Sequence, residues 1–316
     1  MGFEYFPVEL LVVIMLYLDS EDILSMSAVS RAWYKIAHGI APLLPGLTMK
    51  VSVTVPDDGH AVIGPYPSWP FPVEVDFSYE RGVRRFTFNA IVHTMVLSDC
   101  QGINDVSALG GVHTLYLNGC RGIFDFSTLG TVRNLDLSQC PNVVDVSALG
   151  GVHTLYLCYC PNVVDVSALG GVHNLYLTGC LGIADVSALG SVHTLYLTGC
   201  QGIADVSALG SVHTLDLSYC HNVVDVSALG GVHTLNLSNC SGIVDVSALG
   251  GVHTLDLSEC NVADVSNLGG VNTLNLRGCD NVVDVSALGA VHDLNLSNCR
   301  NVVDVSALGR VHSLSL

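Results

Sequence analysis

From residue 92 onward, apolar residues recur in one fixed order about every 20 residues, and one repeat is a residue short. One copy of this V-x-x-L-x-L-x-x-C-x-x-I pattern consists of Val112, Leu115, Leu117, Cys120 and Ile123. Because the T-L-Y-L-N part alternates, we expect a short strand with both leucines on its buried side. No single repeat can bury its apolar face, so eleven full repeats predict a stack whose strands pair as a parallel sheet.

The pattern resembles the leucine-rich repeat, L-x-x-L-x-L-x-x-N/C-x-L, over residues 92–316. The cysteine form is similar to the repeats that follow F-box domains, and the DVSALG segment resembles part of internalin-like repeats. The resemblance implies an α/β repeat solenoid with a curved parallel sheet on its concave face. Families of this style in amoebae and giant DNA viruses are loosely similar.

A different pattern occupies residues 1–40. Leu10, Ile14 and Leu18 recur at helical spacing, Asp19 and Ser20 can cap a second helix, and a third apolar face follows. The segment resembles an F-box, which implies three helices docking onto the Skp-type linker of a cullin-based SCF ubiquitin ligase. A small helical cap on the repeats is the alternative. The resemblance assigns linker docking to Pro7, Leu10, Leu11, Ile14, Leu18, Leu24, Val29 and Trp33.

Residues 41–91 separate the two parts and are rich in proline. The stretches VSVTV, VEVDF and VRRFTF alternate as strands do. A terminal repeat otherwise exposes its apolar side, so we interpret this segment as a connector and an N-terminal cap.

An aspartate precedes each V-S-A-L segment, from Asp105 and Asp125 to Asp304. Its carboxylate can accept from backbone N–H groups two and three residues on, and so open a helical or 3-10 turn. A calcium column is the alternative. Calcium needs six or more oxygen ligands per site, and no G-G-x-G-x-D pattern is present, so we expect a cap and no metal site.

Eleven of the twelve cysteines form a second column, and Cys158 alone lies outside it. Zinc ligands usually come as C-x-x-C pairs, whereas these cysteines stand 19 or 20 residues apart. We expect buried, reduced thiols. The column consists of Cys100, Cys120, Cys140, Cys160, Cys180, Cys200, Cys220, Cys240, Cys260, Cys279 and Cys299.

Ten histidines form a third column, interrupted by Arg133 and Asn272. The plainer interpretation is a polar position at the edge where each strand begins. Two alternatives are pH sensing, because stacked imidazoles repel once protonated, and adventitious binding of divalent metal. The column consists of His93, His113, His153, His173, His193, His213, His233, His253, His292 and His312.

The exposed position between the two strand leucines varies, and it divides the sheet into an aromatic half and a polar or acidic half. Tyrosine offers a large contact area with a polar tip, which is typical of binding hot spots. A ladder of exposed tyrosines without a partner is the alternative. We predict a partner-binding concave face that includes Tyr116, Tyr156, Tyr159, Tyr176, Tyr196 and Tyr219.

The formal net charge of −17 disfavours nucleic acid and membrane surfaces as partners. The apolar run Val8–Leu18 is too short for a membrane span, and the first residues carry no positive charge that a secretory signal would need. We therefore expect a cytoplasmic protein, in the host cytoplasm if the chain is viral. No G-x-x-x-x-G-K-S/T, G-x-S-x-G or H-E-x-x-H motif occurs, so we expect neither catalysis nor a cofactor.

These observations predict a substrate adaptor of an SCF-type ubiquitin ligase, with the F-box on the linker and the repeat sheet on an unknown protein substrate. The main rival is a repeat scaffold that binds protein without delivering a substrate, including a decoy that occupies the linker. An extracellular internalin-like adhesin is a third interpretation, disfavoured by the cysteines and the missing signal.

Overall fold

The computed structural model describes residues 49–51, 60–63, 73–78, 82–88 and 92–316. The predicted F-box, with every predicted linker-docking residue, lies outside these ranges. The chain divides into two compact units, unit 1 (Met1–Thr128) and unit 2 (Leu129–Leu316), which are described one at a time.

Unit 1 contains two parallel sheets in its described part. Strands β1 (Met49–Val51), β3 (Val73–Asp76), β5 (Val92–Val96) and β6 (Thr114–Tyr116) pair in that order. Strands β2 (His60–Ile63) and β4 (Arg85–Phe88) form a separate pair. The 3-10 turns η3 (Ser107–Gly111) and η4 (Ser127–Thr131) follow the first two repeat strands. Strands β3 and β4 confirm the strands predicted in VEVDF and VRRFTF.

The segment around β3 acts as a repeat placed ahead of the first true one. Val75 and Phe77 are buried, and the Phe77 backbone N–H donates to the carbonyl of Val96 over 2.8 Å. The Phe77 carbonyl in turn accepts a hydrogen bond from the Cys100 thiol over 2.9 Å. The connector therefore covers the first repeat and satisfies the first cysteine of the column.

Unit 2 is built of strands and 3-10 turns in strict alternation. Its strands are β7 (Asn134–Asp136), β8 (Thr154–Tyr156), β9 (Asn174–Tyr176), β10 (Thr194–Tyr196), β11 (Thr214–Asp216), β12 (Thr234–Asn236), β13 (Thr254–Asp256), β14 (Thr273–Asn275), β15 (Asp293–Asn295) and β16 (Ser313–Ser315). Its turns are η5 (Ser147–Gly151), η6 (Ser167–Gly171), η7 (Ser187–Leu189), η8 (Ser207–Leu209), η9 (Ser227–Gly231), η10 (Ser247–Gly251), η11 (Ser266–Gly270), η12 (Ser286–Ala290) and η13 (Ser306–Leu308).

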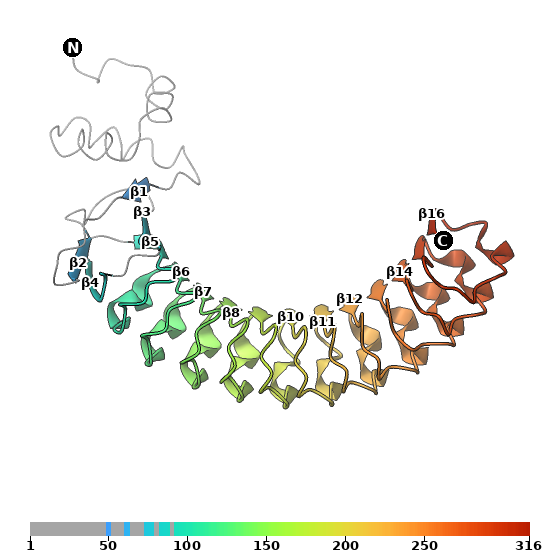
Figure 1. The fold of residues 1–316 in the computed structure, drawn as a ribbon, viewed down its shortest axis with the longest axis horizontal. Coiled ribbons are helices and arrows are strands. Elements are labelled where there is room, and N and C mark those ends of the chain that lie inside the picture. Colours follow the sequence, from blue (N-terminus) through green and yellow to red (C-terminus); the bar gives the residue numbers. More distant parts are fainter. Residues whose placement is uncertain (1–48, 52–59, 64–72, 79–81, 89–91) are drawn as a thin grey trace, which may run out of the picture. The chain divides into compact units, whose positions relative to one another are not determined.

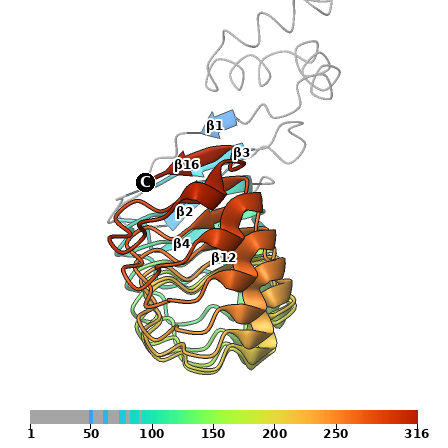
Figure 2. The same cartoon turned by 90° about the vertical axis from the view of Figure 1, so that its right-hand side faces the viewer.

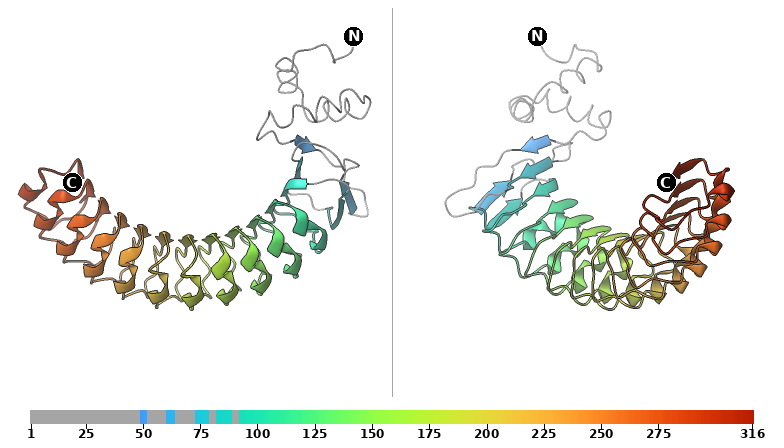
Figure 3. Two further views of the ribbon diagram at one scale, coloured as in Figure 1. Left: turned by 180° about the vertical axis from the view of Figure 1, so that it is seen from behind. Right: turned by 45° about the vertical axis from the view of Figure 1, so that its right-hand side comes forward.

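Within unit 2 the strands follow the concave side of the stack and the 3-10 turns the convex side, from β8 to β16 (Figure 1). The view from behind shows the same arrangement (Figure 3), and the end-on view shows the turns stacked in one column (Figure 2). The described repeats contain 3-10 turns and no α-helix. A 3-10 turn rises about 2.0 Å per residue, against 1.5 Å for an α-helix. It therefore covers more distance with the few residues of a 20-residue repeat that remain to connect one strand to the next.

The strands of unit 2 are all parallel and keep one register. Leu195, for example, pairs with Leu215, 20 residues later. The short repeat leaves this register intact, because Leu255 pairs with Leu274 and the missing residue is taken from the loop after Cys260. Val262 in that loop is still fully buried.

The core of unit 2 is one continuous column of apolar side chains from every repeat. Leu195, Leu197, Cys200, Ile203 and Leu209 each have 0% exposure. Full burial of one leucine or isoleucine contributes about 1.5–3 kcal/mol, so the stack supplies the stability that a single repeat lacks. Across the described residues, no helix has both the length and the apolarity that a membrane crossing requires.

Candidate functional site

The outward-facing position between the two strand leucines forms a row across unit 2, which we call the outward row. Strand pairing places each member opposite the next, because the register is constant. Most members are half-buried by their neighbours on either side. The row consists of Asp136, Tyr156, Tyr176, Tyr196, Asp216, Asn236, Asp256, Asn275, Asn295 and Ser315.

Three consecutive members, Tyr156, Tyr176 and Tyr196, form a stacked tyrosine triad. The first two ring centroids lie 4.3 Å apart with an interplanar angle of 11°, and the second pair lies 4.9 Å apart at 15°. Burial, with Tyr176 and Asp216 close by, raises the pKa of the Tyr196 hydroxyl. The triad presents a stacked aromatic surface, and its role in binding a partner stays a prediction.

The polar half of the outward row is organised by hydrogen bonds between neighbouring strands. The Asn236 side-chain amide donates to Asp216 Oδ2 over 2.9 Å, and that of Asn275 donates to Asp256 Oδ2 over 2.9 Å. The backbone N–H and the hydroxyl of Ser218 both donate to Asp216 Oδ1, over 2.8 and 2.6 Å. These contacts fix the carboxylates in place. This pairing was not predicted from the sequence, although the succession of Asp and Asn in the column was its signal.

Tyr159 and Tyr219 lie outside the row, in the loop before each cysteine. Both have left-handed backbone conformations, with φ of 57° and 61°, and both rings are exposed, at 59% and 50%. Four repeats carry glycine at this position, where a left-handed residue with a side chain costs about 1–2 kcal/mol. The Tyr159 ring lies against Gly179, where an added Cβ would come within 2.6 Å of Cδ1. Five other repeats adopt the same backbone conformation with a non-glycine residue: Asp99, Gln139, Asn239, Glu259 and Asn298. What distinguishes Tyr159 and Tyr219 is therefore the exposed aromatic ring, which suits a contact role.

Tyr116, the remaining predicted tyrosine, belongs to β6 in unit 1. Its side chain points outward with 38% exposure, while Leu115 and Leu117 on either side are fully buried. The predicted alternation on this strand is therefore confirmed.

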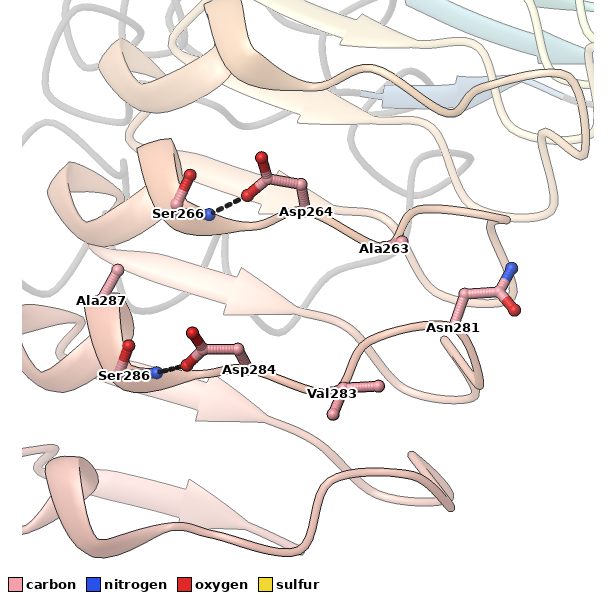
Figure 4. A pocket seen from close by; sticks show the side chains of 8 residues that line it. All are labelled: Ala263, Asp264, Ser266, Asn281, Val283, Asp284, Ser286 and Ala287. Carbon is pink, nitrogen blue, oxygen red and sulfur yellow. Dashed lines mark hydrogen bonds between the residues drawn. The ribbon is translucent and has the colours of Figure 1, made fainter.

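The aspartate column makes one of the two predicted hydrogen bonds, to the backbone N–H two residues on, and one apolar residue separates each aspartate from the first residue of its 3-10 turn. Asp264 Oδ1 accepts from the Ser266 backbone N–H over 2.9 Å, and Asp284 Oδ1 accepts from that of Ser286 over 2.8 Å (Figure 4). Between these two aspartates lies a hollow of about 380 Å³, also lined by Val283. Hydrogen bonds from the serine two residues on lower the pKa of the carboxyl group of each of these aspartates. Within the described residues, no three His, Cys, Asp or Glu side chains come together in a way that could hold a metal ion.

Acidification is expected to destabilise unit 2 through this column. The pKa of each carboxyl is lower in the folded chain than in the unfolded chain. Each carboxylate therefore contributes its full share to the stability of the folded state above about pH 4, and this contribution is lost as the pH falls through the folded pKa. A triple variant, Asp185→Asn, Asp205→Asn and Asp225→Asn, keeps the acceptor oxygens without a titrating group. Its urea midpoint should fall less than that of the parent chain between pH 5 and pH 2.5. Equal falls in the two proteins would contradict this origin of the pH dependence.

The cysteine column holds buried thiols and no disulfide bond. The Cys200 thiol donates to the carbonyl of Leu177 over 3.2 Å, and the Cys240 thiol donates to that of Leu217 over 3.0 Å. Burial raises the pKa of each of these two thiols to about 12. The thiols of this column are therefore free and buried, as predicted, and they donate to backbone carbonyls of the preceding repeat. Cys158 is partly exposed.

The histidine column is stacked along the edge where the strands begin. From His153 to His253, neighbouring ring centroids lie 4.6–4.9 Å apart. The Nδ1 of His193 contacts the Thr194 hydroxyl at 3.2 Å. Burial, together with the charge of Arg133, lowers the pKa of His153. The polar edge position is as predicted, and pH sensing by the column stays a prediction.

Comparison with known proteins identifies the two parts of the chain. Residues 3–41 match the family model described as F-box-like. An internalin, InlF, from Listeria monocytogenes has a similar structure, with a TM-score of 0.50, 17% identity and 94% of each chain covered. The repeats form a leucine-rich-repeat fold. The chain thus carries an F-box-like segment ahead of leucine-rich repeats, and both kinds of module generally bind proteins and lack enzymatic activity.

Other similar structures include the functional domain of InlJ from Listeria monocytogenes, whose description includes a cysteine ladder. It has a TM-score of 0.45 and 17% identity, with 72% of this chain and 58% of that chain covered. A leucine-rich-repeat protein from Leptospira interrogans gives a TM-score of 0.44 and 15% identity, with coverages of 72% and 84%. A search of the curated proteins gave no match.

Proposed function

We propose that this protein is a substrate adaptor of an SCF-type ubiquitin ligase and acts in the cytoplasm. The observation that carries the proposal is the F-box-like match at residues 3–41, joined in one chain to a leucine-rich-repeat fold. An F-box supplies a docking segment for the Skp-type linker. The strand face of unit 2, with its tyrosine triad, supplies a second protein-binding surface on the same chain.

Such an adaptor needs only binding, because other subunits of the ligase transfer the ubiquitin. Pro7, Leu10 and Trp33 would contact the linker, with the other apolar residues predicted for the F-box. On the repeats, the aromatic half of the outward row and the exposed rings of Tyr159 and Tyr219 would hold the substrate. Aromatic side chains held rigid by stacking bind at a low cost in side-chain entropy.

Docking to the linker is tested by pull-down of the full chain with a eukaryotic Skp-type linker. The double variant Leu10→Asp, Trp33→Ala is expected to bind at least about 100-fold more weakly, because it introduces a charge into an apolar interface and removes an aromatic anchor. The Tyr176→Ala variant, altered only on the repeats, is the matched control and should bind the linker as the parent does.

Failure of the parent chain to bind the linker would contradict the adaptor proposal. Binding of the linker together with a cellular partner that depends on Tyr176 would support it. Binding of the linker with no partner that depends on the strand face would favour the decoy instead.

A further inference from the structure

The middle repeats of unit 2 carry no fixed positive charge. Between Arg133 and Arg277 the sequence contains eleven aspartates and glutamates and neither a lysine nor an arginine. The histidines are the sole titratable cations in this stretch. A strongly acidic surface attracts basic partners and repels nucleic acid and anionic lipid.

Two of these acids bracket the tyrosine triad in the outward row. Strand pairing places Asp136 opposite Tyr156 at one end and Asp216 opposite Tyr196 at the other. Strands β7 to β11 therefore present, in order, a carboxylate, three stacked rings and a carboxylate. We call this set the bracketed triad.

Both carboxylates are held in position before any partner arrives. Asp136 Oδ1 accepts from the Ser138 backbone N–H over 2.8 Å. Asp216 accepts from Ser218 and Thr198 through Oδ1, and from Asn236 through Oδ2. These bonds orient both carboxylates. A guanidinium or ammonium group that meets a preorganised carboxylate forms a short, charge-assisted hydrogen bond.

We propose that the bracketed triad binds an extended, basic peptide segment that runs along the stack and crosses strands β7 to β11. This inference rests on the proposed function and names the chemistry of the partner. Four strand spacings of about 4.8 Å separate the two carboxylates, a span of about 19 Å. An extended chain rises about 3.3 Å per residue and covers that span in about six residues.

Six is an even number, so the first and seventh residues of such a segment point to the same side. The geometry therefore selects two cationic residues six positions apart, with apolar residues at the third and fifth positions packed on the tyrosines. The ring of Tyr159, exposed in the loop that follows β8, adds aromatic surface for a cation or an apolar side chain.

The test uses the full chain and fluorescent nine-residue peptides, with affinity measured by fluorescence anisotropy. The first peptide has two arginines six positions apart. Counted from the first arginine, it has leucines at the third and fifth positions. A second peptide replaces both arginines by glutamine, and a third places the arginines three positions apart. The first should bind at least about tenfold more tightly than either of the others, and more weakly as salt is raised.

Variants of the chain then separate the bracketed triad from general acidity. The Asp136→Asn, Asp216→Asn variant should bind the first peptide about tenfold more weakly. The matched control, Asp145→Asn with Asp225→Asn, removes the same charge from the same two repeats in the aspartate column and keeps the turn caps. It should change the affinity less than twofold. Equal losses in both variants, or equal binding of the glutamine peptide, would overturn the inference.

An unbiased selection from random dodecapeptides distinguishes this inference from the proposed function. Selected peptides that need Tyr176 and carry spaced arginines or lysines support both. Selection of neutral peptides whose binding depends on Tyr176 would contradict the proposed basic partner. Protein binding by the strand face would still be supported. A selection that yields no peptide dependent on Tyr176 counts against both.

Discussion

Replacement of Leu197 by alanine is expected to lower the free energy of unfolding by about 3 kcal/mol. The side chain has 0% exposure and lies in the continuous core of unit 2. Its removal takes away buried apolar surface and leaves a cavity, because the parallel strands on either side are fixed by pairing. Urea unfolding followed by circular dichroism measures the change.

Leu181 offers a matched control for this substitution. It lies in the neighbouring repeat, and its side chain is 61% exposed. The same change to alanine should alter the free energy of unfolding by less than about 0.5 kcal/mol. Similar losses in the two variants would mean that the core of unit 2 does not carry its stability.

The second large effect is expected at Gly210, the residue that follows turn η8. A Cβ at this position would collide with the backbone carbonyl oxygen of Ala228 in the next repeat. The carbonyl oxygen of Ala228 belongs to the backbone and cannot rotate away as a flexible side chain can. The turns of the two neighbouring repeats must therefore move apart to admit the new methyl group. The Gly210→Ala variant should lose about 1–3 kcal/mol in free energy of unfolding, measured by the same urea unfolding.

Gly309 occupies the same column and provides the control. Nothing lies within 4 Å of a Cβ placed there, and its φ of −63° suits any residue. Gly309→Ala should therefore leave stability unchanged or raise it by about 0.4–1 kcal/mol, since alanine restricts the unfolded chain more than glycine does. A loss at Gly309 as large as at Gly210 would contradict close approach of the turns as the cause.

The period in the sequence was sufficient to predict the fold of the repeats. Each column of the pattern has one environment, so Leu115, Leu117 and their counterparts could be placed in the core without a structure. The same periodicity predicted the buried thiols and the aspartate hydrogen bonds at the start of the 3-10 turns, because a residue type repeated at one spacing meets one set of backbone groups. The first 40 residues rest instead on a resemblance, supported by the F-box-like match.

Other features depend on backbone geometry and contacts that composition does not encode. Strand β2 was not predicted, because its sequence, HAVI, is a continuous apolar run after the histidine and does not alternate. The left-handed conformation at Tyr159 and Tyr219 follows from the tight turn before each cysteine, and its trace in the sequence was the glycine, asparagine or aspartate that most other repeats carry there. The pairing of Asn236 with Asp216 required the register, which a single repeat does not reveal.

The constant register of unit 2 makes the repeats interchangeable parts. A repeat can be added or removed without disturbing the buried pairs, because the leucine column keeps the same register at each of these junctions. Recombination between near-identical gene segments would therefore lengthen or shorten the stack in whole steps. A repeat gained or lost between strands β7 and β11 would move Asp216 relative to Asp136 by one strand spacing, and so change the length of peptide that the two carboxylates select.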